Sequence, residues 1–152
     1  MQHPQRQQAL DAFYEHAAGR RKLLNGWLSV QAGADLPQQI DIMKQLQRHP
    51  TFSFLDAAAV RSLIFDFAQN NFVHFHRPDG KGYRLLIDAV LQLDQLGSPL
   101  AVEGIRLFSG WRHLKGDRRL LVQRQLQQLI DSDSVSDSLH SAAVAVLGRR
   151  RG

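Results

Sequence analysis

Two histidines, His74 and His76, stand two residues apart in the stretch NNFVHFHRPDGKGYRLL at residues 70–86, and such a pair could bind a metal ion. A catalytic zinc site uses about three protein ligands and keeps a further position open. The sequence shows no third ligand close to the pair. We therefore expect one histidine to be a buried, hydrogen-bonded side chain and the other to lie at the surface. The remaining histidines are scattered, and none begins the helical His-Glu-x-x-His zinc motif.

The segment Asp79-Gly80-Lys81-Gly82 resembles half of a phosphate-binding loop. It lacks the spacing of the common nucleotide fingerprints, and no predicted strand precedes it. Asp-Gly is above all a turn signal, so we interpret the segment as a turn. Anion binding by Lys81 at the start of the following helix is the alternative. The chain has no cysteine and no Gly-x-Ser-x-Gly motif. We therefore do not predict a catalytic, metal or cofactor site within this chain.

The composition suits one domain, residues 1–152, or one compact piece of a larger protein, with 43% hydrophobic residues and a net charge of +5. The excess positive charge lies in short clusters at 20–22, 117–119 and 149–151. No nucleic-acid motif accompanies these clusters, so we interpret them as solvated helix faces and do not expect a nucleic-acid partner. No apolar run reaches the roughly 18 residues of a membrane span, and the first residues do not have the pattern of a signal peptide. The absence of cysteine is compatible with a reducing compartment.

Apolar residues recur at helical spacing through most of the chain. Candidate N-caps are Asp35, Asp56, and either Ser136 or Asp137. The segment Gly97-Ser98-Pro99 predicts the end of one helix followed by the start of the next. The alternating FVHF at 72–75 is too short to predict a strand. Helices are expected over about residues 10–17, 23–28, 35–48, 57–69, 82–93, 99–111, 117–130 and 137–147.

This pattern predicts an all-α chain of about eight helices joined by short connections. Helix pairs recur every 35 to 40 residues or so, which is the scale of HEAT and armadillo units. We therefore predict an α-solenoid, in which each helix pair buries its apolar face against its neighbours. An ordinary globular helical bundle is the alternative, because no three units are visibly similar in sequence.

The stretch at 71–83 resembles a segment of the C-terminal helical domain of bacterial aminopeptidase N, a zinc metallopeptidase family. In the family, the sequence of this segment is approximately Asn-Pro-x-x-Phe-His-x-x-Asp-Gly-Ser-Gly-Tyr. The chain departs from it at Phe72, where the family has proline, and at Lys81, where it has serine. Flanking segments are similar too, over roughly residues 7 to 147. The matching residues are Asn71, Phe75, His76, Asp79, Gly80, Gly82 and Tyr83.

The resemblance implies that this chain is the C-terminal fragment of a larger aminopeptidase of the bacterial cytoplasm. In that family zinc and the catalytic residues belong to an upstream domain, and an armadillo-like superhelix covers the active-site cavity and restricts the entry of peptides. The partners implied are therefore that upstream domain and peptide substrates. The seven matching residues would have structural roles in a hinge between helices. Arg61 matches an arginine of the family's Val-Arg-Ser-Leu run and is the one candidate for contact with substrate in the cavity; an arginine on a solvated helix face is the alternative.

A different class of function also fits a basic helical chain, namely a free-standing helical-repeat adaptor that binds protein or nucleic acid. Such an adaptor would collect Arg20, Arg21, Arg118 and Arg119 on one basic face. Its affinity would then fall steeply as the salt concentration rises.

Overall fold

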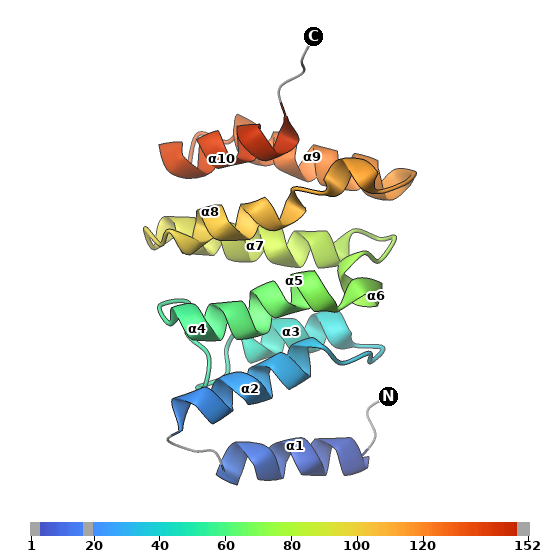
Figure 1. The fold of residues 1–152 in the computed structure, drawn as a ribbon, viewed down its shortest axis with the longest axis vertical. Coiled ribbons are helices and arrows are strands. Elements are labelled where there is room, and N and C mark those ends of the chain that lie inside the picture. Colours follow the sequence, from blue (N-terminus) through green and yellow to red (C-terminus); the bar gives the residue numbers. More distant parts are fainter. Residues whose placement is uncertain (1–3, 17–19, 149–152) are drawn as a thin grey trace. The chain divides into compact units, whose positions relative to one another are not determined.

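The computed structural model of the chain describes residues 4–16 and 20–148, and all regular elements within these ranges are helices (Figure 1). The predicted all-α fold is therefore confirmed. Over the described ranges no helix has the length and apolar content that crossing a bilayer would require. The chain divides into two compact units, Met1–His74 and Phe75–Gly152, which we call the N-terminal unit and the C-terminal unit.

The N-terminal unit begins with α1 (Pro4–His16), α2 (Arg21–Ala32) and α3 (Gln39–Leu46). A long helix follows in three consecutive parts, α4 (Ala57–Val60), the π-helical segment η1 (Arg61–Phe65) and α5 (Asp66–Asn70). Helix α2 packs against this long helix and against α3. The core between them consists of side chains with no exposed surface, among them Leu28, Met43, Val60, Leu63, Ile64 and Phe67. Burial of these apolar side chains is the main stabilising contribution to the unit.

Two predicted helix starts in this unit have different outcomes. Asp56 is confirmed as an N-cap, because its carboxylate accepts a hydrogen bond from the Ala59 N–H at 3.2 Å. Asp35 is not a cap, and that prediction was wrong. Its carboxylate instead contacts the His74 ring, so α3 begins four residues later at Gln39. The stretch FVHF forms the short helix α6 (Phe72–Phe75), which raises the helix total in the described part from the predicted eight to nine.

The C-terminal unit contains α7 (Lys81–Gln95), α8 (Leu100–Ile105), α9 (Asp117–Asp131) and α10 (Asp137–Leu147). Helix α8 contacts both α7 and α10, and α9 contacts α10 and α7. The helices of this unit run back and forth in successive layers (Figure 1), as expected for stacked helix pairs. Ser136 is the N-cap of α10, since its hydroxyl accepts from the Leu139 N–H at 3.1 Å.

The prediction of one helix over 99–111 was wrong. Helix α8 ends at Ile105, and two 3₁₀ turns follow at Arg106–Phe108 (η2) and Trp111–His113 (η3). Apolar side chains of this stretch are still buried in the core, although their backbone lies in 3₁₀ turns and not in a continuous α-helix. Trp111 is buried, and its indole N–H donates to the Val146 carbonyl at 2.9 Å, while Arg112 donates to the Leu147 carbonyl. These bonds satisfy carbonyls at the C-terminal end of α10, which lack partners inside the helix.

Candidate functional site

Asn71 is a buried polar residue at the end of α5 whose side chain joins three backbone groups. Its amide Nδ2 donates to the Ala32 and Ala34 carbonyls, each at 2.8 Å. Its Oδ1 accepts from the His74 N–H at 3.3 Å. Ala32 is the last residue of α2, so Asn71 both closes the end of that helix and starts α6. Within the N-terminal unit this residue therefore connects the end of the long helix to the end of α2 and to α6.

His74 lies in the short helix α6 and His76 directly follows it, and each side chain has its own hydrogen-bond partner. His74 is 9% exposed, and its Nε2 lies 2.8 Å from an Asp35 carboxylate oxygen in the N-terminal unit. His76 is half-buried in the C-terminal unit, and its Nδ1 lies 2.7 Å from the Tyr83 hydroxyl. His74 is therefore the buried, hydrogen-bonded histidine that was expected, whereas His76 is partly exposed and also has a hydrogen-bond partner. In the described part of the chain, no three His, Cys, Asp or Glu side chains gather closely enough to hold a metal ion.

The aromatic cluster around His76 is the central feature of the first turn of the C-terminal unit. Tyr83 has no exposed surface and packs edge-on against Phe75, with ring centres 5.1 Å apart. Burial raises the pKa of the Tyr83 hydroxyl. Burial, together with the nearby positive charge of Arg118, lowers the pKa of His76. The Arg118 Nε also donates to the His76 carbonyl at 2.6 Å, so this arginine ties α9 to the turn.

The segment Asp79–Gly82 is a turn that starts α7. Gly80 has φ 78°, a left-handed conformation that glycine adopts without strain. The Asp79 carboxylate accepts from the Lys81 N–H at 2.9 Å and pairs with Arg77. Burial alone would raise the pKa of Asp79, but these two contacts hold it below its ordinary value. The amide that a bound anion would use is thus already taken by Asp79, which favours the turn interpretation. Gly82 is buried in the first turn of α7.

Arg61 lies at the exposed first position of the π-helical segment η1. A π-helical turn contains one more residue than an α-helical turn and so changes the direction of the side chains along the helix. The buried residues Leu63, Ile64 and Phe65 of the same segment pack in the core. The helix was predicted from its apolar spacing, but the π-helical segment within it was not, because no residue type marks it.

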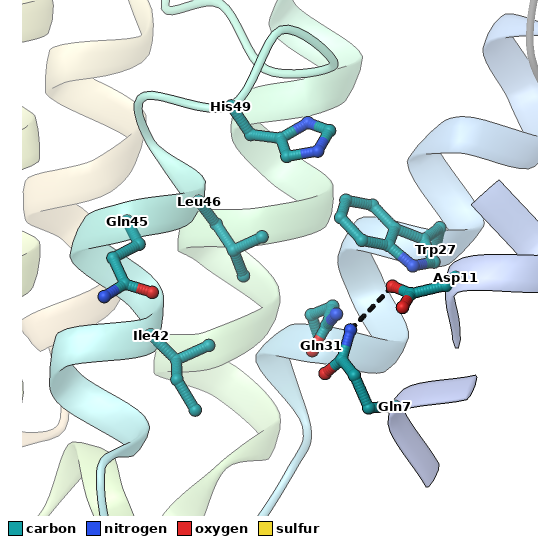
Figure 2. Close-up of a pocket in the computed structure, with 8 residues that line it drawn as sticks. All are labelled: Gln7, Asp11, Trp27, Gln31, Ile42, Gln45, Leu46 and His49. Atoms are coloured by element: carbon teal, nitrogen blue, oxygen red, sulfur yellow. Dashed lines mark hydrogen bonds between the residues drawn. The ribbon is translucent and has the colours of Figure 1, made fainter. Parts of the chain in front are cut away.

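A pocket of about 300 Å³ lies in the N-terminal unit between α1, α2 and α3, and the sequence did not reveal it. Figure 2 shows its side chains converging from these helices and from the segment after α3. Pockets of this kind bring together residues distant in sequence, so composition and spacing carry no signal for them. The lining residues are Gln7, Asp11, Trp27, Gln31, Ile42, Gln45, Leu46 and His49.

Comparison with known proteins gives consistent matches. Residues 1–147 match the sequence profile of a family described as "Domain of unknown function (DUF3458_C) ARM repeats". The chain is 28% identical over 143 residues to aminopeptidase N of Caulobacter vibrioides, an alignment that covers 94% of this chain and 17% of the relative. It is 28% identical over 117 residues to aminopeptidase N of Haemophilus influenzae, covering 77% and 14% respectively.

A solved structure shows the same fold. The crystal structure of Legionella pneumophila aminopeptidase A in complex with aspartic acid aligns with a TM-score of 0.82 at 29% identity. The alignment covers 89% of this chain and 16% of the Legionella chain. This chain therefore spans about a sixth of the length of the proteins it matches.

Replacing the buried amide tests the role of Asn71. Asn71→Ala removes the partner of two carbonyls and one N–H, and we expect it to lower the free energy of unfolding by about 2–4 kcal/mol. The neighbouring Asn70 is the matched control, because its amide donates only to the Asp66 carboxylate in an exposed contact. Asn70→Ala should cost about 0.5 kcal/mol or less. Urea denaturation followed by circular dichroism measures both variants, and equal losses would contradict the account of Asn71.

The lowered pKa of His76 predicts a dependence of stability on pH. Because the folded chain holds His76 neutral, the unfolded chain takes up a proton more readily once the pH falls below the ordinary histidine pKa of about 6.5. The free energy of unfolding should therefore decrease as the pH falls through 6.5 towards the folded pKa. His76→Asn should show a smaller decrease than the unaltered chain in urea titrations between neutral and mildly acidic pH.

His113, which is exposed in η3, provides the control for this experiment. His113→Asn should keep the pH dependence of the unaltered chain. His49, whose pKa is lowered by burial, contributes equally to all three proteins and cancels in the comparison. If His76→Asn and His113→Asn gave the same slope, the titration of His76 would not be coupled to folding.

Tight zinc binding that disappeared in His76→Ala would contradict the structural role of this side chain.

Proposed function

The chain belongs to the DUF3458_C family of ARM-repeat domains, the C-terminal helical domain of aminopeptidases, and from this we propose that it is the non-catalytic cap of an aminopeptidase N. In this proposal the cap covers the active-site cavity of an upstream domain of the same polypeptide. That domain removes N-terminal residues from peptides with the help of zinc, which it holds itself. The polypeptide would reside in the bacterial cytoplasm, a location that rests on the resemblance alone.

The observation that carries the proposal is the disparity in coverage. The aligned regions cover 94%, 77% and 89% of this chain but only 17%, 14% and 16% of the three relatives. The remaining five-sixths or so of such proteins has room for a separate catalytic domain. The family profile spans both compact units, which supports treating residues 1–147 as one functional module.

A cap of this kind contributes to catalysis through access. A helical cover that admits short, unfolded peptides and excludes bulk water strengthens electrostatic interactions at the catalytic residues. The helices do not need reactive side chains for this role. They need a stable backbone and a few side chains that meet the substrate.

Arg61 is the residue of this chain that we assign to substrate contact. It is exposed, and the π-helical segment that it begins is a feature frequently found at functional sites. A guanidinium group can bind a carboxylate through two parallel hydrogen bonds. The C-terminal carboxylate of a short peptide is the group it would recognise.

The alternative of a basic adaptor receives less support. Arg21 pairs with Asp56 at 3.4 Å, and Arg118 donates to the His76 carbonyl. The Arg119 guanidinium lies 5.9 Å from the centre of the Trp111 ring. Three of the four arginines expected on a common basic face therefore have contacts within their own units.

Arg61 can be tested in the polypeptide that contains this chain together with its upstream region. We expect Arg61→Ala to raise KM for short peptides with a free C-terminal carboxylate by roughly tenfold or more, the effect of losing a hydrogen bond to a charged group. KM for aminoacyl anilides, which lack that carboxylate, should not change. Arg61→Lys should recover part of the loss, because lysine keeps the charge without the paired geometry.

The exposed Arg48, which follows α3 in the same unit, is the matched control, and Arg48→Ala should leave both KM values unchanged. If the Arg61→Ala enzyme had an unaltered KM for peptides, the assignment of Arg61 to substrate contact would be wrong. If the polypeptide that contains this chain and its upstream region had no aminopeptidase activity at all, the cap proposal itself would be wrong.

A further inference from the structure

We propose that the pocket between α1, α2 and α3 binds an organic cation, a guanidinium or primary ammonium group. This site is separate from substrate contact at Arg61 and does not depend on the chain being an aminopeptidase cap. Three features of the pocket carry the inference: its charge, a buried acceptor without a partner, and an aromatic wall.

The pocket is negative on a positive chain. Asp11 is the only acid or base with a fixed charge among the described lining residues, and the chain as a whole carries +5. His49, which also lines the pocket, is neutral near pH 7 because burial lowers its pKa. Its Nδ1 accepts from the Thr51 N–H at 3.1 Å, which places the ring proton on Nε2. A cationic group in the pocket would therefore meet one carboxylate and no competing positive charge from these residues.

Gln31 supplies the acceptor. This side chain is 4% exposed, and its Oε1 has no hydrogen-bond partner among the described residues. A buried acceptor without a donor destabilises the folded chain by about 1–3 kcal/mol. Figure 2 shows the Gln31 amide beside Gln7 and Asp11 in the pocket. An N–H group of a bound cation would satisfy Oε1, and the site would then recover this energy on binding.

Gln7 and Trp27 complete the arrangement. The Gln7 Nε2 donates to an Asp11 carboxylate oxygen at 2.7 Å and so holds this exposed acid in place. Trp27 is 4% exposed and forms one wall, with its ring centre 5.0 Å from that of His49. The face of an indole ring attracts cations more strongly than the other aromatic side chains do. The carboxylate, the carboxamide oxygen and the indole would each attract a cation.

The size of the pocket limits the ligand. A volume of about 300 Å³ lies at the lower end of the range of ligand pockets. It suits a single arginine or lysine side chain, or a small free amine, and excludes a polymer. The cation therefore comes either from a free ligand or from a side chain of another part of the same polypeptide.

The test is a titration of the 152-residue chain with Nα-acetylargininamide and Nα-acetyllysinamide, in which the side chain is the only cation, followed through the Trp27 indole N–H resonance in NMR spectra. The two indole resonances are assigned with Trp111→Phe. Nα-acetylcitrullinamide and Nα-acetylnorleucinamide are the neutral analogues of matching shape. We expect saturable shifts of the Trp27 resonance with both cations, with Kd on the order of 1 mM, and at least a tenfold weaker response to the neutral analogues. Nα-acetylargininamide should also raise the melting temperature, whereas Nα-acetylcitrullinamide should not.

Two variants and one control separate binding from folding. Asp11→Asn changes an exposed side chain and should weaken binding of both cations at least fivefold. Gln31→Leu removes the buried acceptor, and should abolish the response without lowering the melting temperature. Asp41→Asn, an exposed acid on α3 that does not line the pocket, should bind like the unaltered chain.

The same titration on a longer polypeptide identifies the source of the cation. A response in both proteins assigns the pocket to a free ligand, whereas a response in the 152-residue chain alone assigns it to a side chain of the longer polypeptide. Equal shifts with neutral and cationic analogues, or unchanged cation binding in Asp11→Asn, would overturn the proposal. So would the absence of any response in the unaltered chain at ligand concentrations well above the expected Kd.

Discussion

The hydrogen bonds of the buried Asn71 amide are the interaction on which the arrangement of the N-terminal unit depends. The end of a helix leaves carbonyl groups without partners, and burying them unsatisfied is costly. Asn71 satisfies the end of α2 by donating to the carbonyls of Ala32 and Ala34, while its own oxygen accepts from the His74 N–H in α6. A side chain without both a donor and an acceptor could not do this. One carboxamide at the end of α5 therefore satisfies backbone groups at the end of α2 and in α6.

The C-terminal unit uses a different solution at its first turn. Tyr83 is fully buried, and its hydroxyl requires a polar partner, which His76 provides. Arg118 then binds the His76 carbonyl from α9, so a single residue links the turn, the aromatic cluster and a helix more than 40 positions along the chain. Five of the seven residues that resemble the aminopeptidase motif thus have contacts within their own units, namely Asn71, Phe75, His76, Asp79 and Tyr83. A helical module held in this way is suited to providing a fixed surface, which is what a cap requires.

The sequence predicted the elements whose signals are local. The helical spacing and the caps at Asp56 and Ser136 depend on residues within a few positions of each other, and the structure confirms them. Predictions failed where a distant partner decides the outcome. Asp35 looked like an N-cap but contacts His74, 39 positions away, and Trp111 lies in a 3₁₀ turn where it reaches Val146. The pocket around Gln31 could not be predicted at all, since its lining comes from three helices and depends on their packing.

The central claim is that this chain is one module of a larger zinc aminopeptidase. The most direct measurement is the native mass of the source polypeptide, determined by immunoblot of the producing cell with an antibody against this chain. The account predicts a band several times the 17.2 kDa of the chain, and zinc-dependent aminopeptidase activity that the same antibody removes from the extract. A band at 17.2 kDa with no activity removed would contradict it, and the chain would then be a free-standing helical protein.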